Sequence, residues 1–287
     1  MAQSTQEAAF KATTWLNEQH KLNEDSKESK KLPMRPIVLG GDDVTLFCQA
    51  DLALGYVDVF CRAFEEASKL ALTPLFNDYL TDARELKPYL TASAGVLYHK
   101  ASHPFVTCHQ IVEGLCQEAK KATKKVDPNT GPAAVSFYRI SNVLAEDIAD
   151  LRMQSQKLVL EHNQTIIGSL GGYLLDVAYE KEMNSLVKLK KYADFARKKK
   201  NGQSMSISIA KFRQMATHLA NGDTEEARRI YARAEELQSK QDASIGNAWR
   251  DNYWVQEHKQ SWLYDLLIYA HFNAPLAKET VSGVAHA

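Results

Sequence analysis

A short acidic turn between two apolar runs constrains this chain more than any other feature of its sequence. Residues 36–50 read Pro-Ile-Val-Leu-Gly-Gly-Asp-Asp-Val-Thr-Leu-Phe-Cys-Gln-Ala, and β-prone residues on both sides of the Gly-Gly-Asp-Asp tip predict a β-hairpin. Gly40 and Gly41 carry no side chain, so a triphosphate could approach closely while Asp42 and Asp43 hold a hard divalent cation. An ordinary acidic turn is the alternative reading, since Gly and Asp are common in turns.

Composition limits the classes of protein to consider. The chain has 287 residues with 35 basic and 35 acidic side chains, so no global field recruits nucleic acid or an anionic membrane. No apolar run reaches the roughly 18 residues that span a bilayer, and the first residues lack the pattern of a secretion signal. Four cysteines match no zinc spacing and are expected as buried, reduced thiols, which favours a cytoplasmic location. They are Cys48, Cys61, Cys108 and Cys116.

The order of expected elements predicts an α+β fold. Apolar periodicity indicates helices at 6–19, 51–72, 104–125, 183–196, 208–220, 224–240 and 257–272. Strands are expected at 35–39, 44–49, 89–98 and 134–140. The first half therefore predicts a mainly antiparallel sheet with helices on one face, and the second half an all-α subdomain. We place the boundary between a palm domain at 1–160 and a helical domain at 161–287.

A second segment completes a family pattern. Residues 91–100 read Thr-Ala-Ser-Ala-Gly-Val-Leu-Tyr-His-Lys, with Pro104 and Phe105 just beyond. Together with the Gly-Gly-Asp-Asp hairpin and the helix between them, this segment resembles the catalytic palm of the large polymerase-like subunit of type III CRISPR effector complexes. The resemblance covers about 35–140 well and the remaining residues loosely.

The resemblance implies a ferredoxin-like palm that uses Mg²⁺ or Mn²⁺ to join ATP molecules into cyclic oligoadenylates, the second messengers of an antiviral response. Asp42 and Asp43 would be the catalytic metal ligands. The nucleotide-binding residues would be Gly40, Gly41, Ser93, Gly95 and Lys100. Of these, Lys100 is inferred as a phosphate contact from its charge and position alone.

One departure from the family pattern predicts dependence on a partner. A complete palm begins with a strand that carries a further metal-binding carboxylate, and only residues 1–5 precede the first expected helix here. The expected partners are a separate first-palm polypeptide and other CRISPR effector subunits, with crRNA and target RNA reached through the complex. Two alternatives are a catalytically degenerate palm that serves as a scaffold or nucleotide sensor, and a different palm nucleotidyltransferase that acts alone or as a homodimer.

Four further patterns have ordinary structural explanations beside functional ones. A zinc site is the alternative to a solvated loop with core thiols at His99, His103, Cys108, His109 and Cys116. The glycine-rich run at 168–172 lacks dinucleotide-binding spacing and is expected to be a loop. The cationic run at 188–200 is either a solvated helix face or an RNA contact. Core packing and a subunit interface both explain the aromatic cluster Trp249, Tyr253, Trp254, Trp262 and Tyr264.

Overall fold

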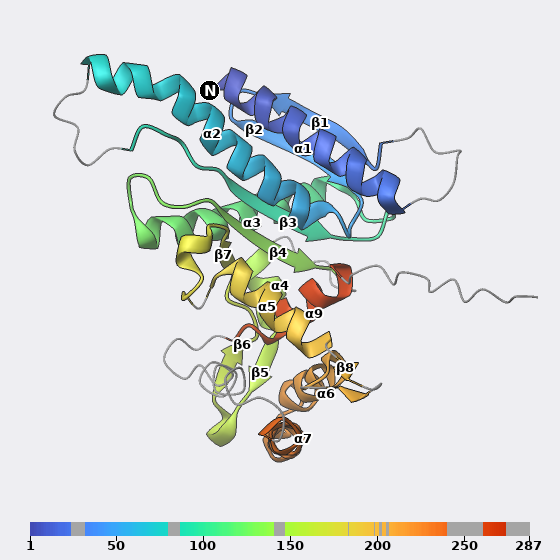
Figure 1. Ribbon diagram of the computed structural model, residues 1–287. Coiled ribbons are helices and arrows are strands. Elements are labelled where there is room, and N and C mark those ends of the chain that lie inside the picture. The colour runs from blue at the N-terminus through green and yellow to red at the C-terminus, as the bar shows by residue number, and fades with distance from the viewer. Residues whose placement is uncertain are drawn as a thin grey trace, which may run out of the picture.

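The structure is a computed structural model, and it contains both helices and small sheets (Figure 1). It describes residues 1–23, 32–79, 87–140, 147–182, 184–197, 199–200, 203–204, 207–239 and 261–273. Of the expected aromatic cluster, Trp249, Tyr253 and Trp254 lie outside these described residues.

A hairpin and two helices form the first layer. The hairpin pairs β1 (Met34–Gly40) with β2 (Asp43–Cys48), as expected from the sequence. Helices α1 (Ala2–Asn23) and α2 (Ala53–Tyr79) lie side by side against it (Figure 1). Helix α2 continues through Pro74, so the connector expected from residue 73 begins later. Residues 35–40 of β1 are exposed, and the hairpin contacts the helices through partly buried residues such as Met34 and Leu46. These pack against a cluster that contains Ala12, Leu16, Leu52 and Tyr56.

A three-stranded sheet lies beside this layer. It is ordered β3 (Ser93–Tyr98), β4 (Ala134–Arg139), β7 (Gly172–Leu174). Strands β3 and β4 are parallel, because α3 (Phe105–Val126) connects them as a crossover, and β7 pairs antiparallel with β4. The expectation of an antiparallel sheet with helices on one face is therefore wrong for this sheet. Helix α3 packs on one of its faces, while residues such as Val96 and Phe137 contact the core on the other.

The second half is mixed rather than all-α, which corrects the expected helical subdomain. Its short strands form β5–β6, β7 and β8–β9, and β7 belongs to the central sheet. Its elements are α4 (Ile148–Ser155), β5 (Lys157–Val159), η1 (Glu161–Asn163), β6 (Thr165–Ile167), η2 (Val177–Tyr179), α5 (Leu186–Arg197), β8 (Lys199–Lys200), β9 (Gln203–Ser204), α6 (Ile209–Ala220), α7 (Thr224–Ser239) and α9 (Leu263–Phe272). The β5–β6 hairpin crosses the proposed boundary at residue 160.

One core joins the helices of the second half to the sheet. Trp262, at the start of α9, is buried among aromatic residues, with ring centroids 5.9 Å from Phe212 and 5.3 Å from Tyr192. The same continuous cluster contains Phe137 of β4 and Tyr173 of β7. Core packing of Trp262 agrees with the first of the two explanations offered for the aromatic cluster.

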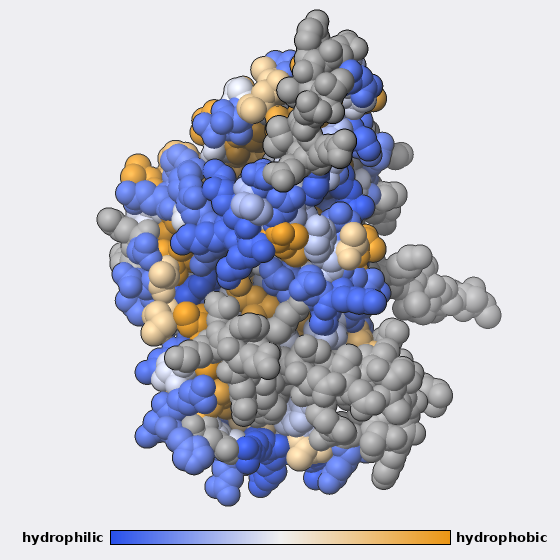
Figure 2. All heavy atoms as spheres, turned by 90° about the vertical axis from the view of Figure 1, so that its left-hand side faces the viewer, coloured by the Kyte–Doolittle hydropathy of each residue, from blue (hydrophilic) through white to orange (hydrophobic). Residues whose placement is uncertain are grey.

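One face of the molecule shows how polar its surface is. The face at the left of Figure 1 is mostly hydrophilic, with hydrophobic side chains in small separate groups (Figure 2). Within the described ranges, no helix combines the length and the apolar character needed to cross a membrane.

All four cysteines are free; Cys61 and Cys108 are buried as expected, whereas Cys48 and Cys116 are only half-buried. Burial raises the pKa of the Cys61 thiol to about 12.

Candidate functional site

The tip of the β1–β2 hairpin has the geometry of a tight turn. Gly40 pairs with Asp43, and Gly41 has a φ of +60° while Asp42 does not have a positive φ. This is the pattern of a type II′ turn, which favours Gly at its first central position. A Cβ on Gly40 would meet nothing within 4 Å. Of the two glycines, Gly41 is therefore the one whose backbone conformation favours glycine.

The two adjacent carboxylates are exposed. The side-chain carboxylates of Asp42 and Asp43 make no hydrogen bond or ion pair with any described residue, although the turn itself is held in place. The Thr5 hydroxyl of α1 donates a 2.7 Å hydrogen bond to the Gly41 carbonyl. The tip is thus fixed through its backbone while its carboxylate oxygens stay available to a ligand. Oxygen ligands of this kind suit Mg²⁺ or Mn²⁺.

Helix α3 holds the start of β3 through Cys116. The Cys116 thiol of α3 donates to the Ser93 carbonyl at 3.2 Å. Burial raises the pKa of this thiol, the cation of Lys120 opposes that effect, and the carboxylates of Glu113 and Asp43 add to it. Ser93 thus contacts Cys116, and the Asp43 carboxylate influences the same thiol; a pocket shared by Ser93 and Asp43 stays a prediction. Lys120 lies one helical turn after Cys116 on α3, among several similar lysines of that helix.

Gly95 has a structural role that does not require a nucleotide. A Cβ at this position would lie 2.4 Å from the Val112 carbonyl oxygen and 2.9 Å from Leu115 Cβ of α3. The same row of the sheet continues through Ser136 of β4 to Gly172 of β7, where a Cβ would also meet α3. Small residues in this row allow α3 to approach the sheet closely. This packing explains glycine at 95, which the sequence prediction assigned to a nucleotide pocket.

Lys100 lies away from the carboxylates. It follows the far end of β3, and five residue steps of about 3.3 Å separate Ser93 from Tyr98 by about 16 Å. At that far end, Phe47 of β2 lies 5.9 Å from both the His99 and the Phe105 rings. The structure therefore does not bring Lys100 together with Asp42 and Asp43.

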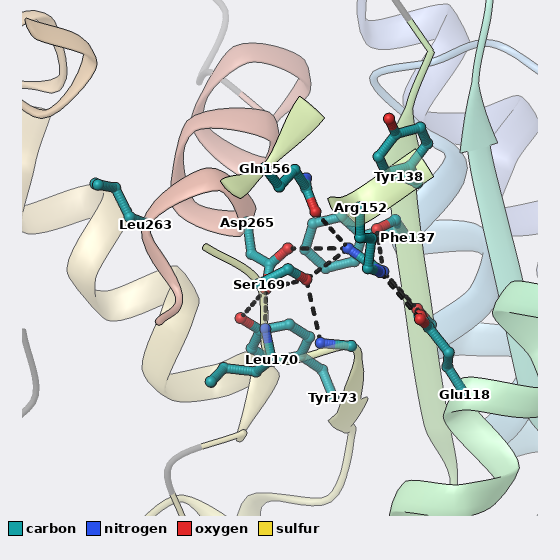
Figure 3. Close-up of polar contacts among 12 residues, drawn as sticks. Glu118, Phe137, Tyr138, Arg152, Gln156, Ser169, Leu170, Tyr173, Leu263 and Asp265 are labelled. Atoms are coloured by element: carbon teal, nitrogen blue, oxygen red, sulfur yellow. Dashed lines mark hydrogen bonds and ion pairs between the residues drawn. The ribbon is translucent and has the colours of Figure 1, made fainter. Parts of the chain in front are cut away.

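A second cluster of carboxylates lies inside the molecule and was missed by sequence analysis (Figure 3). Arg152 of α4 donates from Nε and Nη2 to Glu118 of α3 at 3.0 and 2.8 Å. It also donates to Gln156 at 2.9 Å and to the Ser169 hydroxyl. Ser136, from the row of small residues, donates to Glu118 at 2.7 Å. The guanidinium, with its side chain only 4% exposed, is satisfied entirely by protein groups.

Asp265 of α9 completes this buried network. Its Oδ2 accepts from the Tyr173 hydroxyl at 2.7 Å, the Leu170 amide at 2.8 Å and the Ser169 hydroxyl at 3.0 Å. Its Oδ1 has no hydrogen-bond partner and lies 3.9 Å from Arg152 Nη1. Burial raises the pKa of Asp265 to about 6, although Arg152 and the three hydrogen bonds act in the opposite direction. The segment 168–172 is a loop, as expected, and its backbone helps to hold this carboxylate.

Two of the remaining candidate patterns concern a zinc site and the cationic run. Across the described ranges, no three His, Cys, Asp or Glu side chains gather where they could hold a metal ion. That finding covers both the histidine and cysteine group of 99–116 and the hairpin tip. In the cationic run, Arg197 donates to the Ala270 carbonyl of α9 at 2.6 Å, so this side chain has a structural role.

Comparison of the chain with models of known protein families, and with curated proteins, found no match.

Proposed function

We propose that the hairpin is the nucleotidyl-transfer centre of a palm-type subunit related to the type III CRISPR polymerase subunit. The observation that carries the proposal is the pair Asp42 and Asp43. These adjacent carboxylates are exposed on an anchored turn and are used by no other described part of the chain. A cytoplasmic location belongs to the same proposal.

The reaction would be attack of one ribose hydroxyl on the α-phosphorus of a second ATP. A new P–O bond forms, the bond to the β-phosphate oxygen breaks, pyrophosphate leaves, and the hydroxyl proton is lost to solvent or a base. Bound Mg²⁺ or Mn²⁺ would supply neutralisation of phosphate charge at this site. Asp42 and Asp43 would hold the metal, Gly41 would allow close approach of phosphate, and Lys120 would attract the triphosphate towards the start of β3.

This site needs more ligands than the hairpin provides. Two-metal transfer requires several carboxylates, and no third acidic, histidine or cysteine side chain joins the pair within the described residues. We therefore infer that a second palm-bearing polypeptide of the same effector complex completes the centre. The same observation favours one second candidate, a catalytically degenerate palm that binds nucleotide as a sensor or scaffold.

The test is conversion of labelled ATP with Mg²⁺ or Mn²⁺ by the full chain, alone and with a palm-bearing polypeptide from a neighbouring reading frame. We expect no cyclic adenylate from the chain alone and product only from the pair. Product should disappear in Asp42→Asn/Asp43→Asn and persist in the matched control Glu225→Gln/Glu226→Gln, which removes two adjacent carboxylates from α7. Nucleotide binding without product in every combination would favour the sensor. Synthesis by the chain alone would refute the requirement for a partner.

A further inference from the structure

The solvent side of α3 carries a row of exposed lysines. Helix α3 covers one face of the central sheet, and its other side is exposed. On the second half of that side lie Lys120, Lys121, Lys124 and Lys125, all of them exposed. Because the later three follow the first by one, four and five positions, the four side chains share one face of the helix. We call these four residues the lysine strip.

The acidic residues next to the lysine strip already have cationic partners. The Glu118 carboxylate lies 2.8 Å from Arg152 Nη2, and the Asp127 carboxylate lies 3.1 Å from Lys87 Nζ. Within the described ranges, no acidic side chain forms an ion pair with a lysine of the strip. The strip therefore presents positive charge that the described protein does not balance by contact.

The dipole of α3 accounts for only half of the lysine strip. Cations at the C-terminus of a helix are stabilised by its dipole, but this effect falls off within the last turn. Lys124 and Lys125 lie in the last turn of α3, whereas Lys120 and Lys121 precede it by one turn. The helix thus has more positive charge on this face than its own stability explains.

The other parts of the chain do not supply the missing negative charge. Outside the described residues, the longer segments are 24–31, 80–86, 141–146, 240–260 and 274–287. None of them has more than one acidic residue in excess of its basic residues, and 240–260 has equal numbers of both. A ligand that balances the strip is therefore expected to be a separate molecule with several negative charges.

Exposed aromatic rings lie at the other end of α3. Phe105 begins this helix and is 43% exposed, and its ring centroid lies 5.9 Å from Phe47 and 5.7 Å from His109. The Phe47 ring is 38% exposed and lies 5.9 Å from His99. Arg35, which is also exposed, pairs with Phe47 across the hairpin. We call Phe47, Phe105, His99 and His109 the phenylalanine–histidine group.

The two groups are joined along one exposed line of α3. The line consists of exposed residues three or four positions apart: His109, Glu113, Gln117, Lys120 and Lys124. Fifteen residue steps of 1.5 Å place Lys120 about 22 Å from Phe105 along the helix axis. Glu113 is the acidic residue of this line, and its carboxylate lies 3.9 Å from His109 Nδ1. One extended ligand could therefore contact both groups.

We infer that this face of α3 binds single-stranded nucleic acid, with phosphates on the lysine strip and a base on the phenylalanine–histidine group. Lysines that neutralise phosphates release counterions, which gives affinity without sequence preference. Exposed aromatic and histidine rings accept stacked bases, and the bases of a single strand are free to stack on them. The rings therefore favour a single strand over a duplex, whose bases stack on one another.

The balanced net charge of the whole chain does not oppose this inference. Salt screens exposed charges beyond roughly 8–10 Å, so a ligand on α3 responds to the local lysines and not to the total. The residues involved are also separate from the cationic run at 188–200. The inference does not depend on the proposed function, because phosphate and base contacts require neither ATP nor a divalent metal.

The first test is fluorescence anisotropy of labelled oligouridylate of about 20 nucleotides with the full chain, without ATP or metal. We expect a dissociation constant of about 1–100 µM near physiological salt. Lys121→Gln/Lys124→Gln/Lys125→Gln should bind at least roughly tenfold more weakly, and its plot of log affinity against log salt should be shallower by about 2. The matched control Lys69→Gln/Lys157→Gln/Lys211→Gln removes the same charge from exposed lysines elsewhere and should bind like wild type. Absence of binding by wild type, or equal losses in both triple variants, would overturn the inference.

The second test concerns the rings and leaves every lysine in place. Phe105→Leu keeps an apolar side chain but removes the stacking surface, so it should weaken oligouridylate binding roughly fivefold or more. The matched control is Phe10→Leu, at an exposed phenylalanine of α1, which should leave binding unchanged. A duplex of the same length should bind more weakly than the single strand. Unchanged binding by Phe105→Leu, or equal or tighter binding of the duplex or of phosphatidylserine vesicles, would contradict a site for single strands.

Discussion

Two groups of carboxylates in this protein have opposite surroundings. Glu118 and Asp265 lie against Arg152 between α3, α4 and α9, and protein donors satisfy most of their oxygens. Asp42 and Asp43 project from a hairpin whose backbone is anchored, and no described residue contacts their oxygens. Both groups contain two acidic side chains, so acidity alone does not indicate function.

The two groups differ in what balances their negative charge: protein groups surround the inner carboxylates, whereas water surrounds the outer pair. A buried ion cluster must be matched inside the chain, since an unpaired charge away from water is costly, and the matching ties several elements together. An exposed pair at a rigid turn is stable in water and remains available to a cation. We therefore assign the inner group to the fold, and the outer pair stays the proposed metal site.

Among the variants that test this comparison, Arg152→Met should lose the most free energy of unfolding. It leaves Glu118 and Asp265 without their cation and should lower the free energy of unfolding by about 3–5 kcal/mol. Urea unfolding followed by circular dichroism measures the change. The matched control is Arg62→Met, which removes an exposed i,i+4 pair with Asp58 and should cost less than about 1 kcal/mol. Similar losses in the two variants would contradict a structural role for the inner group.

The pH dependence of stability should report Asp265 directly. Its pKa is raised from 3.8 to about 6, chiefly by burial, so between these values the folded state binds more protons than the unfolded state. The contribution of this group to the free energy of unfolding should therefore fall as pH rises from 4 to 6, by up to about 3 kcal/mol. Urea unfolding of wild type and Asp265→Asn across this range isolates the effect. A difference between the two proteins that does not change with pH would contradict it.

Local sequence patterns predicted the elements better than their arrangement. The hairpin at 36–50 and the helices at 104–125 and 208–220 follow from turn chemistry and apolar periodicity, which are local. The parallel pairing of β3 with β4 was missed, and so was β7, whose three residues are too short to show a strand pattern. The placement of sheet partners depends on contacts between distant residues, which one sequence does not reveal.

The inner network was not predictable for the same reason. Arg152 and Glu118 are 34 residues apart, and Ser169 and Asp265 are 96 residues apart. Each residue alone resembles an ordinary polar position on a helix or loop. The outer pair was predictable because Asp42 and Asp43 are neighbours in the chain and their turn has its own signature. Ser93 begins β3, where it contacts Cys116, whereas Lys100 follows the other end of β3.

Gly95→Ala tests whether packing, rather than a ligand, explains the glycine on β3. The new Cβ would collide with the backbone of α3 at Val112, so the variant should lose about 1–3 kcal/mol of unfolding free energy without any nucleotide present. Gly40→Ala, where a Cβ meets nothing within 4 Å, should be nearly neutral. Thermal unfolding of both variants is sufficient. A fully stable Gly95→Ala would return this residue to the candidate nucleotide pocket.

The smallest effect on stability is expected at the outer pair. Asp42→Asn/Asp43→Asn should change the free energy of unfolding by less than about 0.5 kcal/mol, since both side chains are exposed and unpaired within the described structure. Urea unfolding measures this change. A loss as large as that expected for Arg152→Met would mean that the hairpin carboxylates support the fold.

Binding of Mn²⁺ in the presence of ATP, followed by electron paramagnetic resonance, tests the assignment of the outer pair most directly. Wild type and Glu225→Gln/Glu226→Gln should bind alike, while Asp42→Asn/Asp43→Asn should bind at least roughly tenfold more weakly, about 1.4 kcal/mol, with an unchanged fold. Wild-type affinity in the hairpin variant would contradict the account.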